Sequence, residues 1–358
     1  MKLLDWYIIK KYLTTFFLAI TLIICIAVVF DLTEKVDDII ERQIPAKVLI
    51  VEYYFNFIPF FVNLFSPLFV FVSVIFFTSK LASRTEIIAI LAGGVSFKRF
   101  LLPYLLASSL ITLLTFWLGN FVIPHANERR INFDYMYLKN LKYASYHNVF
   151  KQIKPNEVIY VESYDEETKT AFRFSLEKFK NKSLIYKLNA DVIKWDTLSK
   201  SWKLDNFRIR TFKGEKENLR SGIRLDTLLG FYPSEFKGLK SEVEMMNYYE
   251  LNQFIADETA KGSDMVNSYL LEKHRRIAFP FATIILTFIA VPLASRKVRG
   301  GIGLNMGIGL GIAFFFIFLM QVSSVFATEG GVNPSLAVWI PNVIFGVLAV
   351  FLLLKAPK

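Results

Sequence analysis

A single acidic side chain, Glu86, stands in a short polar segment between two long apolar stretches, where another protein could reach it. The segment covers residues 79–100 and reads SKLASRTEIIAILAGGVSFKRF. Its spacing predicts a short helix within about 83–94, with Ser83 as N-cap, Glu86 in the first turn and Gly93–Gly94 at the end. The residues expected to contact a partner are Glu86, Arg84, Ile87, Ile88 and Leu91. A surface helix that lies on anionic lipid headgroups would show the same spacing.

Four cations lie just beyond apolar stretches, at the depth where lipid headgroups would be. Lys35 follows the first stretch, and Lys273, Arg275 and Arg276 precede the fourth. Guanidinium groups pair well with phosphates, so these residues are candidates for holding a phosphorylated headgroup. The alternative is that the side chains extend toward ordinary headgroups without selecting one.

Three glycines spaced four residues apart occur at the start of the fifth apolar stretch. Gly303, Gly307 and Gly311 would form a ridge of small residues on one helix face, which allows two helices to approach closely. Such a ridge suits a seam between two chains that must open, or a static packing contact.

Patterns of hydrolytic, redox or metal chemistry are absent from the sequence. It contains no G-x-x-x-x-G-K-[ST], H-E-x-x-H, G-x-S-x-G or C-x-x-C, and its one cysteine, Cys25, excludes an intramolecular disulfide. Cys25 lies within the first apolar stretch, and we expect it to have a packing role there. The acidic run from Asp31 to Glu41 lacks the spacing of a calcium loop. These features predict a non-enzymatic chain with no catalytic residue, no metal and no cofactor of its own. If it transports against a gradient, another polypeptide must bind the nucleotide.

The elements that carry these residues are six apolar stretches, three on each side of a polar insert. They cover about 12–30, 54–78, 100–123, 277–294, 302–326 and 337–354, and each is long enough to be a membrane-spanning helix. The hydrophobic content of 54% agrees with this class. Short loops on one side are rich in Lys and Arg, which predicts that both termini are cytoplasmic and that the insert lies outside. The net charge of +11 reflects this topology, and we expect no nucleic-acid partner.

The insert shows a different period from its flanks, because apolar and polar residues alternate. Residues 157–164 read EVIYVESY, and turn residues separate this stretch from similar ones. The predicted fold is therefore a membrane α-helical protein with an inserted all-β domain, a small sandwich or open barrel resembling a jelly roll. The predicted domains are 1–124, 125–276 (ending in a helical connection) and 277–358. A groove or an ordinary core would hold the inward candidates Phe172, Phe174, Trp202, Leu204, Phe207 and Ile209.

Three short patterns resemble one family of permeases. They are Leu4-Asp5-x-Tyr7-Ile8, the run Glu86-Ile87-Ile88-Ala89-x-x-Ala92-x-Gly94, and Pro124 at the exit of the third stretch. These resemble the YjgP/YjgQ permeases, which are the LptF/LptG subunits of the lipopolysaccharide exporter. The opening residues are more similar to LptG than to LptF, and the resemblance extends over nearly the whole chain.

The resemblance implies a role and a set of partners. Members form a dimer with a second homologous permease on a cytoplasmic ABC ATPase dimer, which uses ATP and Mg, in the inner membrane of a Gram-negative bacterium. Lipopolysaccharide passes to a periplasmic bridge protein toward the outer membrane. The family's docking acid matches Glu86, and its lateral gate between the first span of one subunit and the fifth of the other matches Gly303, Gly307 and Gly311. LptG members carry a basic residue near the outer end of the first span, where this chain has Asp31; Lys35 is the nearest substitute.

Two other functions remain open on the sequence. A permease for another lipid or a lipoprotein would share this architecture. A receptor or scaffold for a periplasmic ligand would need an output domain, and the cytoplasmic loops are too short to form one.

Overall fold

The computed structural model describes residues 3–138, 145–165, 168–181, 183–214, 216–236, 243–263, 265–298, 300–329 and 331–356. It consists of two compact units. One comprises Met1–Arg130 together with Asn267–Lys358, and the other comprises Ile131–Val266. The first is helical and the second is built on a β-sheet, which confirms the predicted fold class of a helical membrane protein with an inserted β domain.

Six helical stretches in the described part of the chain are long and apolar enough to cross a membrane. They are formed by α1 (Leu3–Glu41), α2–η1–α3 (Ala46–Ser83), α5–η2–α6–η3 (Phe97–Leu138), α9 (Val266–Ala294), α10 (Gly301–Thr328) and α11 (Pro334–Leu354). The number of spans matches the prediction, but the helices are longer than their apolar segments. The continuous α1 has 39 residues, because a helix need not end where its apolar run ends.

Hydrogen bonds between polar side chains and neighbouring helices fasten this bundle. Lipid offers a polar group no partner, so each such bond fixes two helices to each other. The bonds join α1 to α9, α3 to α5, α10 to α3 and α11 to α9. They are Tyr12 with Thr287 at 3.0 Å, Thr78 with Tyr104 at 3.1 Å, Asn305 to Ser79 at 2.9 Å, and Asn342 to the Ala278 carbonyl at 2.8 Å.

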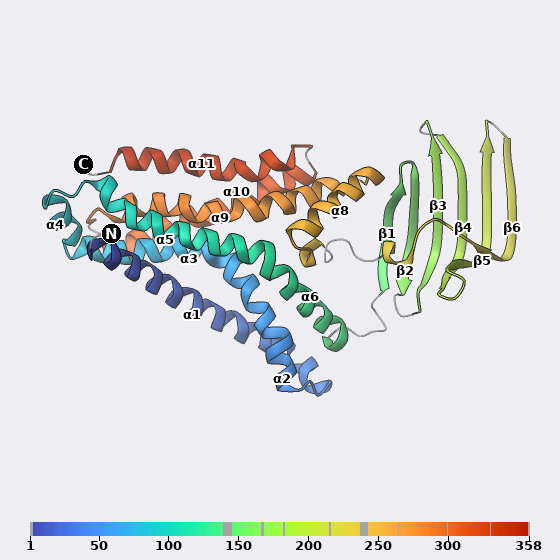
Figure 1. Cartoon of the computed structure of the whole chain (residues 1–358), viewed down its shortest axis with the longest axis horizontal. Helices are drawn as coiled ribbons and strands as arrows, with labels where there is room; N and C mark the ends of the chain where they lie inside the picture. Colours follow the sequence, from blue (N-terminus) through green and yellow to red (C-terminus); the bar gives the residue numbers. More distant parts are fainter. Residues whose placement is uncertain are drawn as a thin grey trace. The chain divides into compact units, whose positions relative to one another are not determined.

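The short helix α4 (Glu86–Ala92) lies at the same end of the bundle as the start of α1 and the end of α11 (Figure 1). This arrangement agrees with an even number of crossings. The predicted partner-binding segment, the start of α1 and the end of α11 therefore lie at one end of the bundle.

The β unit is one antiparallel sheet whose strands follow chain order (Figure 1). They are β1 (Ser145–Lys154), β2 (Glu157–Asp165), β3 (Thr170–Lys180), β4 (Ser183–Asp196), β5 (Ser201–Lys213) and β6 (Lys216–Thr227). The all-β prediction is confirmed, with a correction to its connectivity. A jelly roll pairs strands that are distant in sequence, whereas here each short connection pairs a strand with the next one.

The alternation of side chains along β3 differs from the prediction. Phe172 and Phe174 were expected on one face, but Phe172 is 43% exposed and Phe174 only 2%. Between them Arg173 has φ +50°, a left-handed conformation that interrupts the pleat. Asn206, with φ +54°, has the same effect on β5, so that Leu204 and Phe207 are both buried although they are three residues apart.

The apolar face of the sheet is covered by the segment 229–236, which includes the turn η5 (Pro233–Phe236). Phe231 and Phe236 are 5% and 0% exposed. The indole N–H of Trp202 donates to the carbonyl of Phe231 at 3.0 Å. We call residues 229–236 the covering segment.

Charged residues beside the β1 edge connect the sheet to the covering segment and to α8 (Tyr248–Lys261). The Glu235 carboxylate lies 2.6 Å from the Lys151 ammonium and 3.2 Å from that of Lys261, which in turn lies 3.0 Å from Glu258. Burial by itself raises the pKa of Glu235, but the two lysines outweigh it and hold the pKa below its ordinary value of 4.5. The network therefore stabilises the unit when Glu235 is ionised.

Replacing Glu235 by Gln is expected to destabilise the β unit by about 2 kcal/mol at pH 7, because Lys151 loses its carboxylate while only 5% exposed. Because the folded pKa is lowered, this contribution is complete above the ordinary carboxyl pKa and disappears as the pH falls through the folded value. Thermal unfolding of the whole chain, followed by tryptophan fluorescence, should show a decrease of about 5 °C at pH 7 that shrinks in acid. Glu217→Gln, in an exposed pair with Arg210, should change the midpoint little. A pH-independent difference would contradict the assignment.

Candidate functional site

The helix α4 presents Glu86 at its first position, with the side chain about one third exposed. The prediction of a short helix ending at Gly93–Gly94 holds, but Ser83 is not its N-cap. Ser83 is the last residue of α3, and its hydroxyl donates to the Lys80 carbonyl at 2.9 Å. The residue before α4 is Thr85, whose φ of +60° turns the chain sharply between the two helices.

The side chains of α4 divide into an anchoring face and an outer face. Ile87 is 1% exposed and belongs to the main core, so it holds α4 in place and does not form part of a docking surface. Ile88 is 57% exposed, Leu91 is half-buried, and Arg84 lies at the junction, 4.0 Å from the Glu86 carboxylate. The surface available to a partner therefore contains Glu86, Arg84 and Ile88.

Two contacts connect this region to the start of α1. The Tyr7 hydroxyl donates to Glu86 Oε2 at 3.4 Å. The Asp5 carboxylate accepts two hydrogen bonds from the Arg99 guanidinium, each 2.7 Å long, and Asp5 is only 3% exposed. In the sequence, Asp5 and Tyr7 belong to a family pattern, and Arg99 has no assigned role. An acid at the beginning of a membrane helix was the available signal, because such a group requires a partner.

The glycine ridge of α10 faces outward. Gly303, Gly307 and Gly311 are exposed, and no other described atom lies within 4 Å of the place where a Cβ would be at each. Gly309, on another face of α10, lies against Ile75 and Phe71 of α3. The ridge is therefore not used for packing within the described chain, so a static intrachain contact is excluded for these three glycines.

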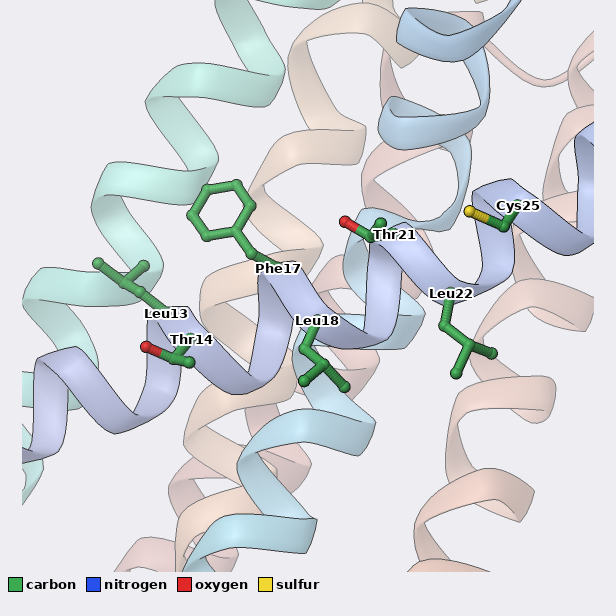
Figure 2. Close-up of a pocket in the computed structure, with 7 residues that line it drawn as sticks. All are labelled: Leu13, Thr14, Phe17, Leu18, Thr21, Leu22 and Cys25. Atoms are coloured by element: carbon green, nitrogen blue, oxygen red, sulfur yellow. The ribbon is translucent and has the colours of Figure 1, made fainter.

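One side of α1 carries a shallow, open groove of about 780 Å³. Seven residues line it, and all of them lie on α1 (Figure 2): Leu13, Thr14, Phe17, Leu18, Thr21, Leu22 and Cys25. Cys25 is exposed there, which corrects the expectation of a packing role. The α1 groove and the α10 ridge are thus two of the apolar surfaces that the described helices leave exposed.

The cations predicted to hold a lipid headgroup differ in whether a nearby carboxylate already pairs with them. The Lys35 ammonium lies 2.6 Å from Asp31 and also bonds to the Tyr53 hydroxyl, so its charge is already matched. Arg275 and Arg276 share the Glu272 carboxylate at 2.6 and 3.0 Å. Lys273 forms no ion pair with a described residue. The start of α9 therefore keeps an excess of positive charge among the described residues, whereas the part of α1 around Lys35 does not.

The predicted groove residues of the β unit are brought together on one face of the sheet. Of these residues, Phe174, Trp202, Leu204 and Phe207 are at most 5% exposed, and Ile209 packs beside them. Phe172 is the exception, because the interruption at Arg173 leaves it exposed. The ring centroids of Phe231 and Phe236 lie 5.4 and 5.7 Å from that of Trp202. These covering residues were not identified from the sequence, because segment 229–236 has no regular period.

Within the described residues, no group of three or more His, Cys, Asp or Glu side chains is arranged to hold a metal ion. The geometry of the described residues offers a partly exposed acid on a short helix at one end of the bundle, a basic helix start, exposed apolar helix faces and a covered apolar sheet. These are features of a chain that binds partners or lipid.

Comparison with known proteins agrees with this arrangement. The family described as lipopolysaccharide export system permease LptF/LptG matches residues 6–355. A search of the curated proteins gives no match.

Proposed function

Because the chain belongs to the LptF/LptG family of lipopolysaccharide export permeases, it is a non-catalytic transporter subunit of the inner membrane, and we propose that it extracts lipopolysaccharide for an ATP-driven exporter. In this proposal it works beside a second homologous permease and delivers the lipid to a periplasmic bridge. The family match over nearly the whole chain is the observation that carries the proposal.

The proposed energy source is a separate cytoplasmic ABC ATPase dimer, which would bind ATP and Mg. The exposed face of α4 supports this, because the Glu86 side chain is about one third exposed and Ile88 is 57% exposed, so that a partner can reach both. On this account both termini and α4 are cytoplasmic, and the β unit is periplasmic. The distribution of Lys and Arg in the short loops supports this orientation.

The proposed lipid path uses two of the exposed helix surfaces. The α1 groove of one permease would face the α10 glycine ridge of the other, and acyl chains would pass between them. Lys273, Arg275 and Arg276 would attract the phosphorylated headgroup at the outer end of the path, since three cations there oppose the single carboxylate of Glu272. Lys35 would instead hold α1 to the segment that carries Tyr53.

The proposed bridge contact is strand β6. It forms one edge of the described sheet, and nearly all of its side chains are exposed, with Leu219 at 61% and Ile223 at 76%. An unpaired edge can accept a strand from another β domain.

Acyl chains would enter the apolar face of the sheet in place of the covering segment. Phe236→Ala is therefore expected to increase the affinity for an acyl chain about fivefold, because it favours the uncovered state, although it lowers stability. The measurement is quenching of Trp202 by dibrominated stearate, in the full chain with its other tryptophans replaced. Leu188→Ala, a core change on the strand side, should lower stability without raising the affinity. Equal affinities in both variants would mean that residues 229–236 are permanent core.

The proposed function is tested by mass spectrometry of lipid that copurifies with the chain. We expect a species with the acylated, phosphorylated disaccharide of lipopolysaccharide. Recovery of another lipid alone would replace this proposal with a permease for that lipid, and a stable chain with no bound lipid and no ATPase would favour a receptor or scaffold.

A further inference from the structure

Helix α1 packs against the described bundle along its first half, is more exposed over residues 21–30, and has a second fastening near its outer end. Its buried residues all lie in the first half and end at Ile20. None of residues 21–30 is buried. Near the outer end, Lys35 and Asp31 contact Tyr53. Movement of residues 21–30 therefore depends on what holds the helix on either side of them, which on the inner side includes the Tyr12–Thr287 hydrogen bond as well as the contacts of the first turns.

The inner fastening connects α1 to the first turn of α5. Both oxygens of Asp5 bond to Arg99, which is the third residue of α5 and follows the N-cap Ser96. A bidentate pair fixes orientation as well as distance, so the two helix ends have little freedom to rotate against each other. Because Asp5 is 3% exposed and the Arg99 side chain 35%, solvent weakens this pair less than it would a fully exposed one.

A second contact connects α1 to the first residue of α4. The Tyr7 hydroxyl donates to Glu86, and the neighbouring Ile87 is buried in the same core cluster as Ile8 and Ile9. Residues 93–96 then join α4 to α5. Both the beginning of α4 and the helix that follows it are therefore held by the first turns of α1.

We infer that Asp5 and Tyr7 are positioning residues that make α1 move together with α4. This inference rests on the proposed function, in which an ATPase moves α4. A helix transmits displacement along its length, so a shift at Glu86 and Arg99 reaches the exposed face of α1 that carries the groove. The start of α1 is thereby a part of the energy-coupling unit, in addition to α4 itself.

The test uses the whole chain in its complex with the ATPase and the second permease, in lipid vesicles. The quantity measured is the coupling ratio, which is ATP hydrolysis with lipopolysaccharide divided by hydrolysis without it. We expect Asp5→Asn and Arg99→Gln to lower this ratio about threefold to tenfold while the complex remains assembled. The exchanged pair, Asp5→Arg with Arg99→Asp, should restore part of it. Lys10→Gln, which removes an exposed charge from α1, is the matched control.

Tyr7→Phe provides a second test in case the charge variants fail to fold, because it removes only one hydroxyl from a side chain that is 40% exposed. It should lower the coupling ratio about twofold, whereas Thr15→Val should not, since the Thr15 hydroxyl bonds only within α1. A wild-type ratio in assembled Tyr7→Phe and Asp5→Asn complexes would overturn the inference. Absence of any ATPase complex with the wild-type chain would instead overturn the proposed function on which it rests.

Discussion

Glu86→Lys should abolish association with the ATPase while the chain remains folded. A misplaced like charge at a protein interface costs several kcal/mol, and each 1.4 kcal/mol is a tenfold loss of affinity. The effect on folding should be small, because Glu86 is about one third exposed and its bond to Tyr7 is 3.4 Å long. The measurement is copurification of the ATPase with the tagged chain, scored against the amount of folded chain.

Two controls define this result. Glu329→Lys reverses an exposed acid at the far end of α10 and should leave ATPase recovery unchanged. Lys98→Gln removes an exposed charge from the first turn of α5, shortly after α4 in the sequence, without changing α4. If Glu86→Lys recovered as much ATPase as these two variants, α4 would be an ordinary surface helix, and the ATPase would have to dock elsewhere.

Gly307→Leu should lower lipid export about tenfold without unfolding the chain. A leucine side chain has free space there within the chain, because no other described atom lies within 4 Å of the Cβ position. In a close seam with a second permease the same side chain would overpack the contact, at a cost of about 1–3 kcal/mol. Export in reconstituted vesicles and the melting temperature of the isolated chain measure the two effects separately.

Two other glycines serve as controls for Gly307→Leu. One lies on another helix and has the same free space, and one lies on α10 itself and has none. Gly346 of α11 also has free space, so Gly346→Leu should affect neither export nor stability. Gly309→Leu should destabilise the isolated chain, since its Cβ would overlap Ile75 Cδ1. Export by Gly307→Leu at the level of Gly346→Leu would show that the ridge takes no part in a seam.

The helical unit and the existence of a β domain could be predicted from the sequence because their periods are strong. A run of about 20 apolar residues indicates a membrane-spanning helix, and alternation of apolar and polar residues indicates a half-buried strand. The position of Glu86 in a short helix followed from Gly93–Gly94 and from the lack of other acids nearby. These features depend on local composition alone.

What could not be predicted depends on contacts between residues that are distant in sequence or on single backbone angles. The turn at Thr85 is made by a left-handed residue with no glycine to indicate it. Arg173 and Asn206 are also left-handed residues, and each interrupts the alternation of its strand. Because strict alternation was assumed for β3, the prediction put Phe172 on the buried face, whereas it is exposed. The pairing of Asp5 with Arg99 spans 94 positions, and the hydrogen bond of Lys35 to the Tyr53 hydroxyl joins residues of different helices.

The most direct measurement of the central claim is ATP-dependent release of lipopolysaccharide from vesicles that contain the chain, the second permease and the ATPase, with a periplasmic bridge domain as acceptor. The account predicts transfer of lipopolysaccharide to the acceptor that requires ATP hydrolysis and is lost with Glu86→Lys. Assembled complexes that hydrolyse ATP but transfer no lipopolysaccharide, or that transfer a different lipid, would contradict it.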